Sequence, residues 1–290
     1  LSGLDEPEEI AQLTALERGS LMHEVMERAM RRWLPDDPPS ETRRDDHLAE
    51  LDRIAAGVFV AYEARGVTGY PALWEADREA ILLDLRLWYE REVADQHTGR
   101  FDAADFEVGF GLSGGNGGSH STERPLELPV GSGLRFHGRI DRLEWRREGG
   151  GFRVIDYKTG RFRDRKKDVF AGGTALQLPL YLRAAADMIL GRDWQEGRSE
   201  YFYSTRKGGF TRVEMTADKL SSHHEEFERL LRGFAQAMSD GTFVARPSDD
   251  NCRFCDFRTL CPAVDDHRAQ RDRKSDDQRV QALDELAKIE

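Results

Sequence analysis

Two short segments of this 290-residue chain carry acidic and basic side chains at spacings that suit phosphodiester hydrolysis. They read Gly-Arg-Ile-Asp-Arg, which contains Asp141, and Asp-Tyr-Lys-Thr-Gly, which contains Asp156 and Lys158. Both are predicted to be β-strands, because each is mostly apolar or alternating and three consecutive glycines separate them. Since successive side chains of a strand point to opposite faces, Asp156 and Lys158 are expected on the same face.

Pairing of these strands as a hairpin would bring Asp141 close to Asp156 at the end of a sheet. Two adjacent carboxylates repel each other unless a divalent cation lies between them. A lysine beside such a cation can hold an attacking water or stabilise charge on a phosphate. The three side chains therefore predict a metal-dependent phosphodiesterase site. The alternative is a solvated salt bridge in an exposed hairpin.

Other elements supply polar residues that the same site could use. A predicted N-terminal helix carries Arg18 and His23, and a predicted strand before the hairpin carries Glu107. A helix after the hairpin carries Gln177 and Tyr181, which share one face at the i, i+4 spacing. Without further context, each of these could equally be an ordinary core or surface residue.

The order of these motifs resembles the RecB-type nuclease domain of the PD-(D/E)XK superfamily, over roughly residues 10 to 262. The likeness is greatest to the iron–sulfur branch that includes the AddB subunits of AddAB helicase-nucleases. The motifs that carry the resemblance are, in order, Arg-Gly-x3-His, Phe-Glu-x-Gly-Phe-Gly, Gly-Arg-Ile-Asp-Arg, Asp-Tyr-Lys-Thr-Gly, Gln-x3-Tyr and Cys-x2-Cys-x5-Cys.

The resemblance implies a role for each residue of the predicted site. His23, Asp141 and Asp156 would bind Mg²⁺ or Mn²⁺ together with the backbone carbonyl of Tyr157, and Lys158 would be the catalytic lysine.

The remaining motif residues would act around this centre. Gln177 and Tyr181 would line the site and touch the DNA backbone or the attacking water. Glu107 would bind a second metal or orient a ligand. A basic stretch after the catalytic lysine is expected to contact DNA, through Arg161, Arg163, Arg165, Lys166 and Lys167.

All three cysteines of the chain, Cys252, Cys255 and Cys261, fall within ten residues. An odd number of thiols does not close into disulfides, which favours a reducing setting. Clustered thiolates bind zinc or an iron–sulfur cluster, which normally needs four of them. The resemblance implies a [4Fe–4S] cluster whose fourth cysteine would precede Leu1, so that the chain would be a piece of a longer protein. The alternatives are a degenerate cluster and three leftover buried thiols.

Composition limits the wider interpretation. The net charge is −11, whereas DNA enzymes usually present a basic surface. We therefore expect weak independent DNA binding and delivery of the strand by a larger assembly. No run of about 18 apolar residues occurs, and no signal peptide is visible, so we expect a cytoplasmic protein without membrane contact.

The predicted fold is α/β: a central mixed sheet flanked by helices, with a restriction-endonuclease-like core, a helical N-terminal portion and the site at one sheet edge. The predicted parts are a helical portion (1–98), the nuclease core (99–246), the cysteine segment (247–264) and a charged tail (265–290). Helices are expected over about 8–33, 44–65, 71–96, 174–190 and 217–239, and strands over about 104–111, 125–130, 134–145, 152–158, 199–205 and 209–215.

The predicted function is metal-dependent hydrolysis of DNA, as an exonuclease acting on single-stranded ends that a helicase subunit or domain delivers during double-strand break repair. One alternative is a stand-alone or CRISPR-adaptation nuclease of the same superfamily. A second is a non-catalytic scaffold that binds DNA ends.

Overall fold

The computed structural model describes residues 11–34, 36–96, 101–113, 117–131, 133–148, 150–163, 169–243 and 276–289, together with residues 252, 255, 269 and 272. The chain divides into two compact units. The first consists of Leu1–Leu126, His137–Asp164 and Leu178–Lys219, and the second of Glu127–Phe136, Arg165–Gln177 and Leu220–Glu290.

Helix α1 (Ala15–Trp33) begins the first unit. Thr14 caps its N-terminus, because the Thr14 side chain accepts a hydrogen bond from the Glu17 amide at 3.2 Å. The buried side chains recur every three or four residues, so that one face of the helix is apolar. They are Leu21, Met22, Val25, Met26, Ala29, Met30 and Trp33.

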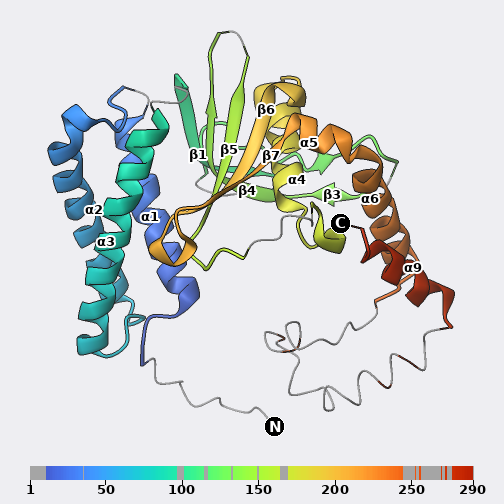
Figure 1. Cartoon of the computed structure of the whole chain (residues 1–290), viewed down its shortest axis with the longest axis horizontal. Coiled ribbons are helices and arrows are strands. Elements are labelled where there is room, and N and C mark those ends of the chain that lie inside the picture. Colours follow the sequence, from blue (N-terminus) through green and yellow to red (C-terminus); the bar gives the residue numbers. More distant parts are fainter. Residues whose placement is uncertain are drawn as a thin grey trace. The chain divides into compact units, whose positions relative to one another are not determined.

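Helices α2 (Arg44–Ala64) and α3 (Pro71–Gln96) pack with α1 at one side of the sheet, where α1 contacts the strands and α2 lies farthest from them (Figure 1). Pro71 opens α3, a position where its missing N–H costs no helical hydrogen bond. One hydrophobic core joins the three helices to the sheet. Trp33 is central to it, because its ring stacks on His47 and its Nε1 donates to Glu50 at 3.0 Å.

The sheet of the first unit has five strands in the order β1-β4-β5-β6-β7. β5 and β6 run parallel and the other neighbouring pairs run antiparallel, so the sheet is mixed. The strands are β1 (Ala103–Phe110), β4 (Gly138–Trp145), β5 (Phe152–Lys158), β6 (Gly197–Tyr203) and β7 (Arg212–Thr216).

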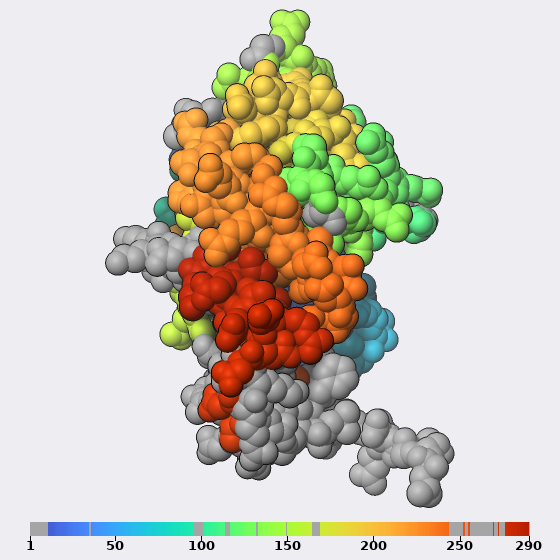
Figure 2. Space-filling model, turned by 90° about the vertical axis from the view of Figure 1, so that its right-hand side faces the viewer, coloured from blue at the N-terminus to red at the C-terminus, as the bar shows by residue number. Residues whose placement is uncertain are grey.

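In the second unit, α6 (His224–Ser239) and α9 (Gln278–Leu286) pack against each other (Figure 2). Gly233 allows this contact, because a Cβ there would lie 2.4 Å from Leu286 Cδ1. Shorter elements complete the described chain: η1 (Glu41–Arg43), β2 (Leu126–Glu127), β3 (Arg135–Phe136), η2 (Ala171–Gly173), α4 (Gln177–Ala184), η3 (Ala185–Leu190), η4 (Trp194–Glu196), η5 (Arg206–Gly208) and α5 (Ala217–Ser222).

The predicted α/β class with a mixed sheet and helical N-terminal portion is confirmed. Several element bounds differ from the prediction. The strand expected over 134–145 is two strands, the helix expected over 174–190 turns π-helical after Ala184, and the helix expected over 217–239 is two helices. Among the residues described, none of the helices combines the length and the apolar character needed to cross a bilayer.

Candidate active site

The hairpin of β4 and β5 brings the two predicted aspartates together. Its register runs from Trp145 opposite Phe152 to Arg142 opposite Ile155. Asp141 and Asp156 are the next pair in this register, just where the ladder ends. β4 and β5 are inner strands, so the prediction of a site on a sheet edge is wrong: the carboxylates lie at the ends of central strands.

Lys158 faces Asp156 as the two-residue spacing predicts. Its Nζ lies 2.5 Å from Asp156 Oδ2 and 4.9 Å from the centre of the Tyr201 ring. Asp156 is buried, whereas the Lys158 side chain is 36% exposed. The ammonium group therefore neutralises a buried carboxylate while remaining accessible to a ligand from solvent.

Helix α1 contributes His23. Its Nδ1 lies 3.4 Å from Asp141 Oδ2, and the same oxygen accepts the backbone N–H of Tyr157 at 2.8 Å. Gly19, one turn earlier, lets the helix approach the chain after β5, because a Cβ there would come within 3.2 Å of Thr159 Oγ1. The Arg-Gly-x3-His motif thus combines a close helix approach with a side chain delivered to the site.

Glu107 has an unusual backbone conformation. Its φ is 53°, in the left-handed region that non-glycine residues rarely occupy. The flanking peptides are held from outside the strand ladder: the Phe106 carbonyl accepts Arg31 at 2.8 Å, and the Glu107 carbonyl accepts the Gly118 amide at 3.1 Å. Strain of this kind persists only where the surroundings fix it.

Burial is the main cause that raises the pKa values of the three carboxyl groups, and neighbouring carboxylates add to it for Asp141 and Glu107. Burial, followed by repulsion from Asp156, raises the pKa of Asp141 to about 7. Burial, followed by repulsion from Asp141, raises the pKa of Glu107 to about 6. Burial also raises the pKa of Asp156, against the attraction of Lys158. Burial lowers the pKa of His23 despite the nearby carboxylates, which favours the neutral imidazole.

This donor set fits a hard divalent cation. Carboxylate oxygens are the ligands that Mg²⁺ and Mn²⁺ prefer, and a ligating imidazole must be neutral. Among the described residues, however, no three histidine, cysteine or carboxylate side chains already converge at metal-ligating distance. Asp156 is instead paired with Lys158. Binding of a cation by both aspartates would therefore require Asp156 to exchange its lysine partner for the metal.

The structure places Tyr181 near the carboxylates but assigns Gln177 to the second unit. Tyr181 packs edge-on against Phe110, and a Cβ at Gly138 would come within 3.0 Å of its ring, so Tyr181 lies at the strand ends that flank Asp141. Gln177 is the first residue of α4 and belongs to the second unit; its approach to the carboxylates stays a prediction.

The predicted DNA contacts are described only in part. Arg161 and Arg163 are exposed, as a contact with a strand would require. Arg165, Lys166 and Lys167 lie outside the described residues.

The sequence analysis missed a buried ionic network on the opposite face of the hairpin. Arg142 Nη1 donates to Tyr157 Oη at 2.8 Å and to Glu92 of α3 at 2.9 Å, and Arg142 also pairs with Glu144. The Tyr157 peptide thus has its N–H on Asp141 and its side chain in this network. A signal was present, because Ile140, Arg142 and Glu144 share the buried face of one strand.

Arg153 extends the network. It pairs with Asp95 of α3 at 2.7 Å and with Glu144 of the neighbouring strand. Arg153 and Glu144 are both 2% exposed, so these charges compensate one another away from water.

Two of the three predicted cluster ligands are described. The Cys255 amide donates to the Cys252 carbonyl at 3.5 Å, which places both residues within one turn. Cys252 is half-buried and Cys255 is exposed, and both are free thiols. Cys261 lies outside the described residues.

Comparison with known proteins identifies the family. The profile of the PD-(D/E)XK nuclease superfamily matches residues 1–262. The chain belongs to this superfamily. Nucleases of the superfamily generally use divalent metal ions, in accord with the donor set of His23, Asp141 and Asp156.

One curated relative and one solved structure are also similar. An ATP-dependent helicase/deoxyribonuclease subunit of Moorella thermoacetica (strain ATCC 39073 / JCM 9320) is 41% identical over 120 residues, which are 38% of this chain and 10% of that protein. The match therefore spans about a tenth of the relative's length. The structure described as "Crystal structure of SSO0001" is 17% identical, with a TM-score of 0.32, over 84% of this chain and 85% of the other.

Proposed function

We propose that the chain is a metal-dependent deoxyribonuclease domain that hydrolyses phosphodiester bonds of single-stranded DNA ends. The observation that carries the proposal is the meeting of His23, Asp141, Asp156 and Lys158 at the ends of two central strands. Burial raises the pKa values of both aspartates, and repulsion from Asp156 raises that of Asp141 further, so a cation bound there would relieve both costs. The family match supports hydrolysis of nucleic acid as the reaction.

Asp141 and Asp156 would hold Mg²⁺ or Mn²⁺, with the neutral His23 imidazole and the Tyr157 carbonyl completing the protein ligands. A bound divalent cation supplies Lewis-acid polarisation of a phosphate and lowers the pKa of an attacking water. Lys158, released from Asp156, would donate to a non-bridging phosphate oxygen and stabilise the charge that develops there. Tyr181 would border the bound strand, and Gln177 would orient the backbone or the water. Glu107 would orient a ligand or hold a second cation.

A helicase partner and a role in double-strand break repair form the wider part of the proposal. Their support is the similarity to a helicase/deoxyribonuclease subunit and the net charge of −11, which is unfavourable for independent capture of DNA. Within that assembly the domain would act as an exonuclease in the cytoplasm, on strand ends that the helicase delivers.

The test is cleavage of a labelled single-stranded oligonucleotide with Mg²⁺ or Mn²⁺. Asp156→Ala and Lys158→Ala should abolish cleavage, and His23→Ala should raise the metal concentration for half-maximal rate by about tenfold or more. Melting temperatures measured in parallel separate loss of chemistry from loss of folding, because Asp156 is buried and Lys158 compensates its charge. Full activity of Asp156→Ala would refute the mechanism, and an inactive wild type that still binds DNA ends would favour the scaffold alternative.

A further inference from the structure

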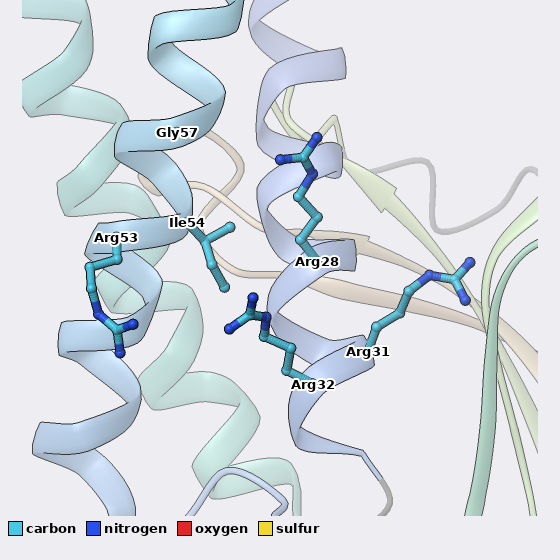
Figure 3. Close-up of a pocket in the computed structure, with 6 residues that line it drawn as sticks. All are labelled: Arg28, Arg31, Arg32, Arg53, Ile54 and Gly57. Carbon is cyan, nitrogen blue, oxygen red and sulfur yellow. The ribbon is translucent and has the colours of Figure 1, made fainter.

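An arginine-rich cavity lies between α1 and α2, away from the carboxylates but on the helix that carries His23. Its volume is about 420 Å³, and it is lined by Arg28, Arg31, Arg32, Arg53, Ile54 and Gly57 (Figure 3). Four of these six residues are arginines in a chain whose net charge is −11. The cavity therefore gathers four guanidinium groups, of which Arg28, Arg31 and Arg32 each pair with a glutamate.

The arginines of α1 differ in what they can still bind. Arg31 points away from α2 toward the strands (Figure 3) and is engaged with Glu27 at 2.7 Å and the Phe106 carbonyl at 2.8 Å. Arg28 pairs with Glu24 and Arg32 with Glu50, yet their side chains remain 53% and 62% exposed. A guanidinium group has five N–H donors in a planar fork, so both retain donors for an external anion.

Gly57 provides an independent indication that the cavity is kept open. It lies inside α2, where glycine is unfavourable relative to alanine. A Cβ at Gly57 would meet no heavy atom of the described residues within 4 Å, so packing does not require a glycine there. Because Gly57 has no side chain, the part of the cavity next to it stays open. Gly19 is the contrasting case, since a Cβ there would press on Thr159.

The chemistry of the lining selects the ligand class. Guanidinium forks match the oxygen geometry of phosphates. None of the described residues that line the cavity is aromatic, so it lacks the aromatic platforms on which successive bases of a single strand stack. Contacts of this kind recognise the nucleic-acid backbone without regard to sequence. Arg28 and Arg32 are five and nine positions after His23, about 7.5 and 13.5 Å along the helix axis. They emerge about 140° and 180° around the axis from His23, so a strand bound at both places would cross over α1.

We propose that the cavity between α1 and α2 binds backbone phosphates of the nucleic-acid strand, on the face of α1 opposite His23 and about 1.4 to 2.5 helical turns along the helix from it. The proposal rests on the proposed nuclease function and adds to it a path for the uncleaved part of the strand. The glutamate partners of Arg28 and Arg32 limit the positive potential, which makes the cavity a weak guide for a delivered strand.

Gly57→Gln tests the cavity without removing a charge. The new side chain would fill the cavity, and replacing a helix-interior glycine should raise the melting temperature. Affinity for a long single-stranded oligonucleotide, measured by fluorescence anisotropy in EDTA, should nevertheless fall about tenfold or more, as loss of a charge-assisted contact implies. KM for that substrate should rise with kcat unchanged. The matched control is Ala56→Gln, which adds the same side chain at the neighbouring exposed position.

Arg32→Gln and Arg53→Gln test the phosphate contact itself. Each should reduce the slope of log affinity against log salt by about 0.7, the value for one phosphate of a single strand. A purely structural role of the arginines would leave that slope unchanged. A short oligonucleotide that reaches only the cleavage centre should be cleaved equally by all variants.

The two proposals fail in different ways. If the wild type cleaves DNA while Gly57→Gln and the arginine variants match Ala56→Gln in affinity and salt slope, the cavity proposal is overturned and the nuclease proposal stands. If the wild type neither binds nor cleaves DNA with any divalent metal, both are overturned.

Discussion

Lys158 and a divalent cation compete for the same carboxylate. The Lys158 ammonium compensates Asp156, while Asp141 relies on the Tyr157 amide and His23. A cation between the aspartates would take over the compensation of both and free Lys158 for substrate. Lys158 is therefore expected to weaken metal binding and yet to be required for cleavage. Metal affinity and cleavage rate, measured separately on one variant, distinguish these two effects.

Lys158→Met should bind Mn²⁺ about threefold to tenfold more tightly than the wild type, because removal of a nearby positive charge lowers the repulsion felt by the cation. The same variant should not cleave DNA. Asp156→Asn should lose both binding and cleavage. Isothermal titration calorimetry with Mn²⁺ measures the affinities, and Lys207→Met, which removes an exposed lysine of η5, is the control. Weaker Mn²⁺ binding by Lys158→Met would contradict the competition.

At the residue scale, the sequence predicted the side chains whose positions follow from strand geometry. Asp156 and Lys158 share a face because they are two residues apart, and Asp141 joins them through a hairpin register. The left-handed Glu107 could not be predicted, because Arg31 and Gly118, distant in the chain, fix the peptides around it. Such contacts depend on how elements pack.

At the scale of elements, the sheet and α3 are joined by charges in a place where apolar packing is usual. Arg142 is fully buried and reaches Glu92 of α3 and Glu144 of its own strand. Desolvating these groups is costly, so each depends on its partners. Because the Tyr157 hydroxyl belongs to the same network, the packing of α3 helps to position the peptide that touches Asp141.

Arg142→Met should lower the free energy of unfolding by about 3–5 kcal/mol, because it removes the guanidinium 2.9 Å from the buried Glu92 and leaves the buried Glu144 with Arg153 alone. Arg86→Met, which breaks the exposed pair of Arg86 with Asp52, should cost only about 0–1 kcal/mol. Urea unfolding of both variants gives the comparison. Equal decreases in the free energy of unfolding of the two variants would show that burial does not determine how much an ion pair contributes to stability. If Arg142→Met does not fold, Tyr157→Phe tests the same network more mildly. It removes one hydrogen bond and should lower the free energy of unfolding by about 1 kcal/mol.

The sequence predicted most elements of the first unit by periodicity but not all of their ends. Helix α1 begins at Ala15, directly after its Thr14 cap, and not near residue 8 as predicted. The break before β4 was missed, because the alternation of apolar and polar residues runs from Leu134 through His137 to Ile140 without a turn signal, and periodicity does not register a change of partner. The buried charges were missed for a related reason: apolar patterning identifies a core face only where that face is apolar.

For the whole molecule, overall charge is a poor guide to the interacting surface. The chain is acidic, yet arginines line the cavity between α1 and α2, and two exposed arginines follow Lys158. The acidic excess includes the carboxylates that a cation would neutralise. A strand could therefore be guided locally while free DNA is held weakly, which is the behaviour expected of a domain to which another component delivers substrate.

The cysteines provide a test of the whole chain that is independent of nuclease activity. Cys252 and Cys255 lie within one turn, and Cys261 is the third thiol of the Cys-x2-Cys-x5-Cys motif. A [4Fe–4S] cluster needs a fourth ligand beyond these three. Anaerobic reconstitution of the chain with iron and sulfide should therefore give a brown but labile protein.

Cys255→Ser should remove the colour and the bound iron, and it should cancel any gain in melting temperature, because metal binding adds to folding free energy. Iron and zinc content, visible absorption and melting temperature are the measurements, compared with the wild type before and after reconstitution. Mn²⁺ affinity of the aspartate site should be equal in Cys255→Ser and wild type, since the thiols are not among its predicted ligands. Stoichiometric zinc, retained after exposure to iron and sulfide, would refute the cluster and leave a structural zinc site in its place.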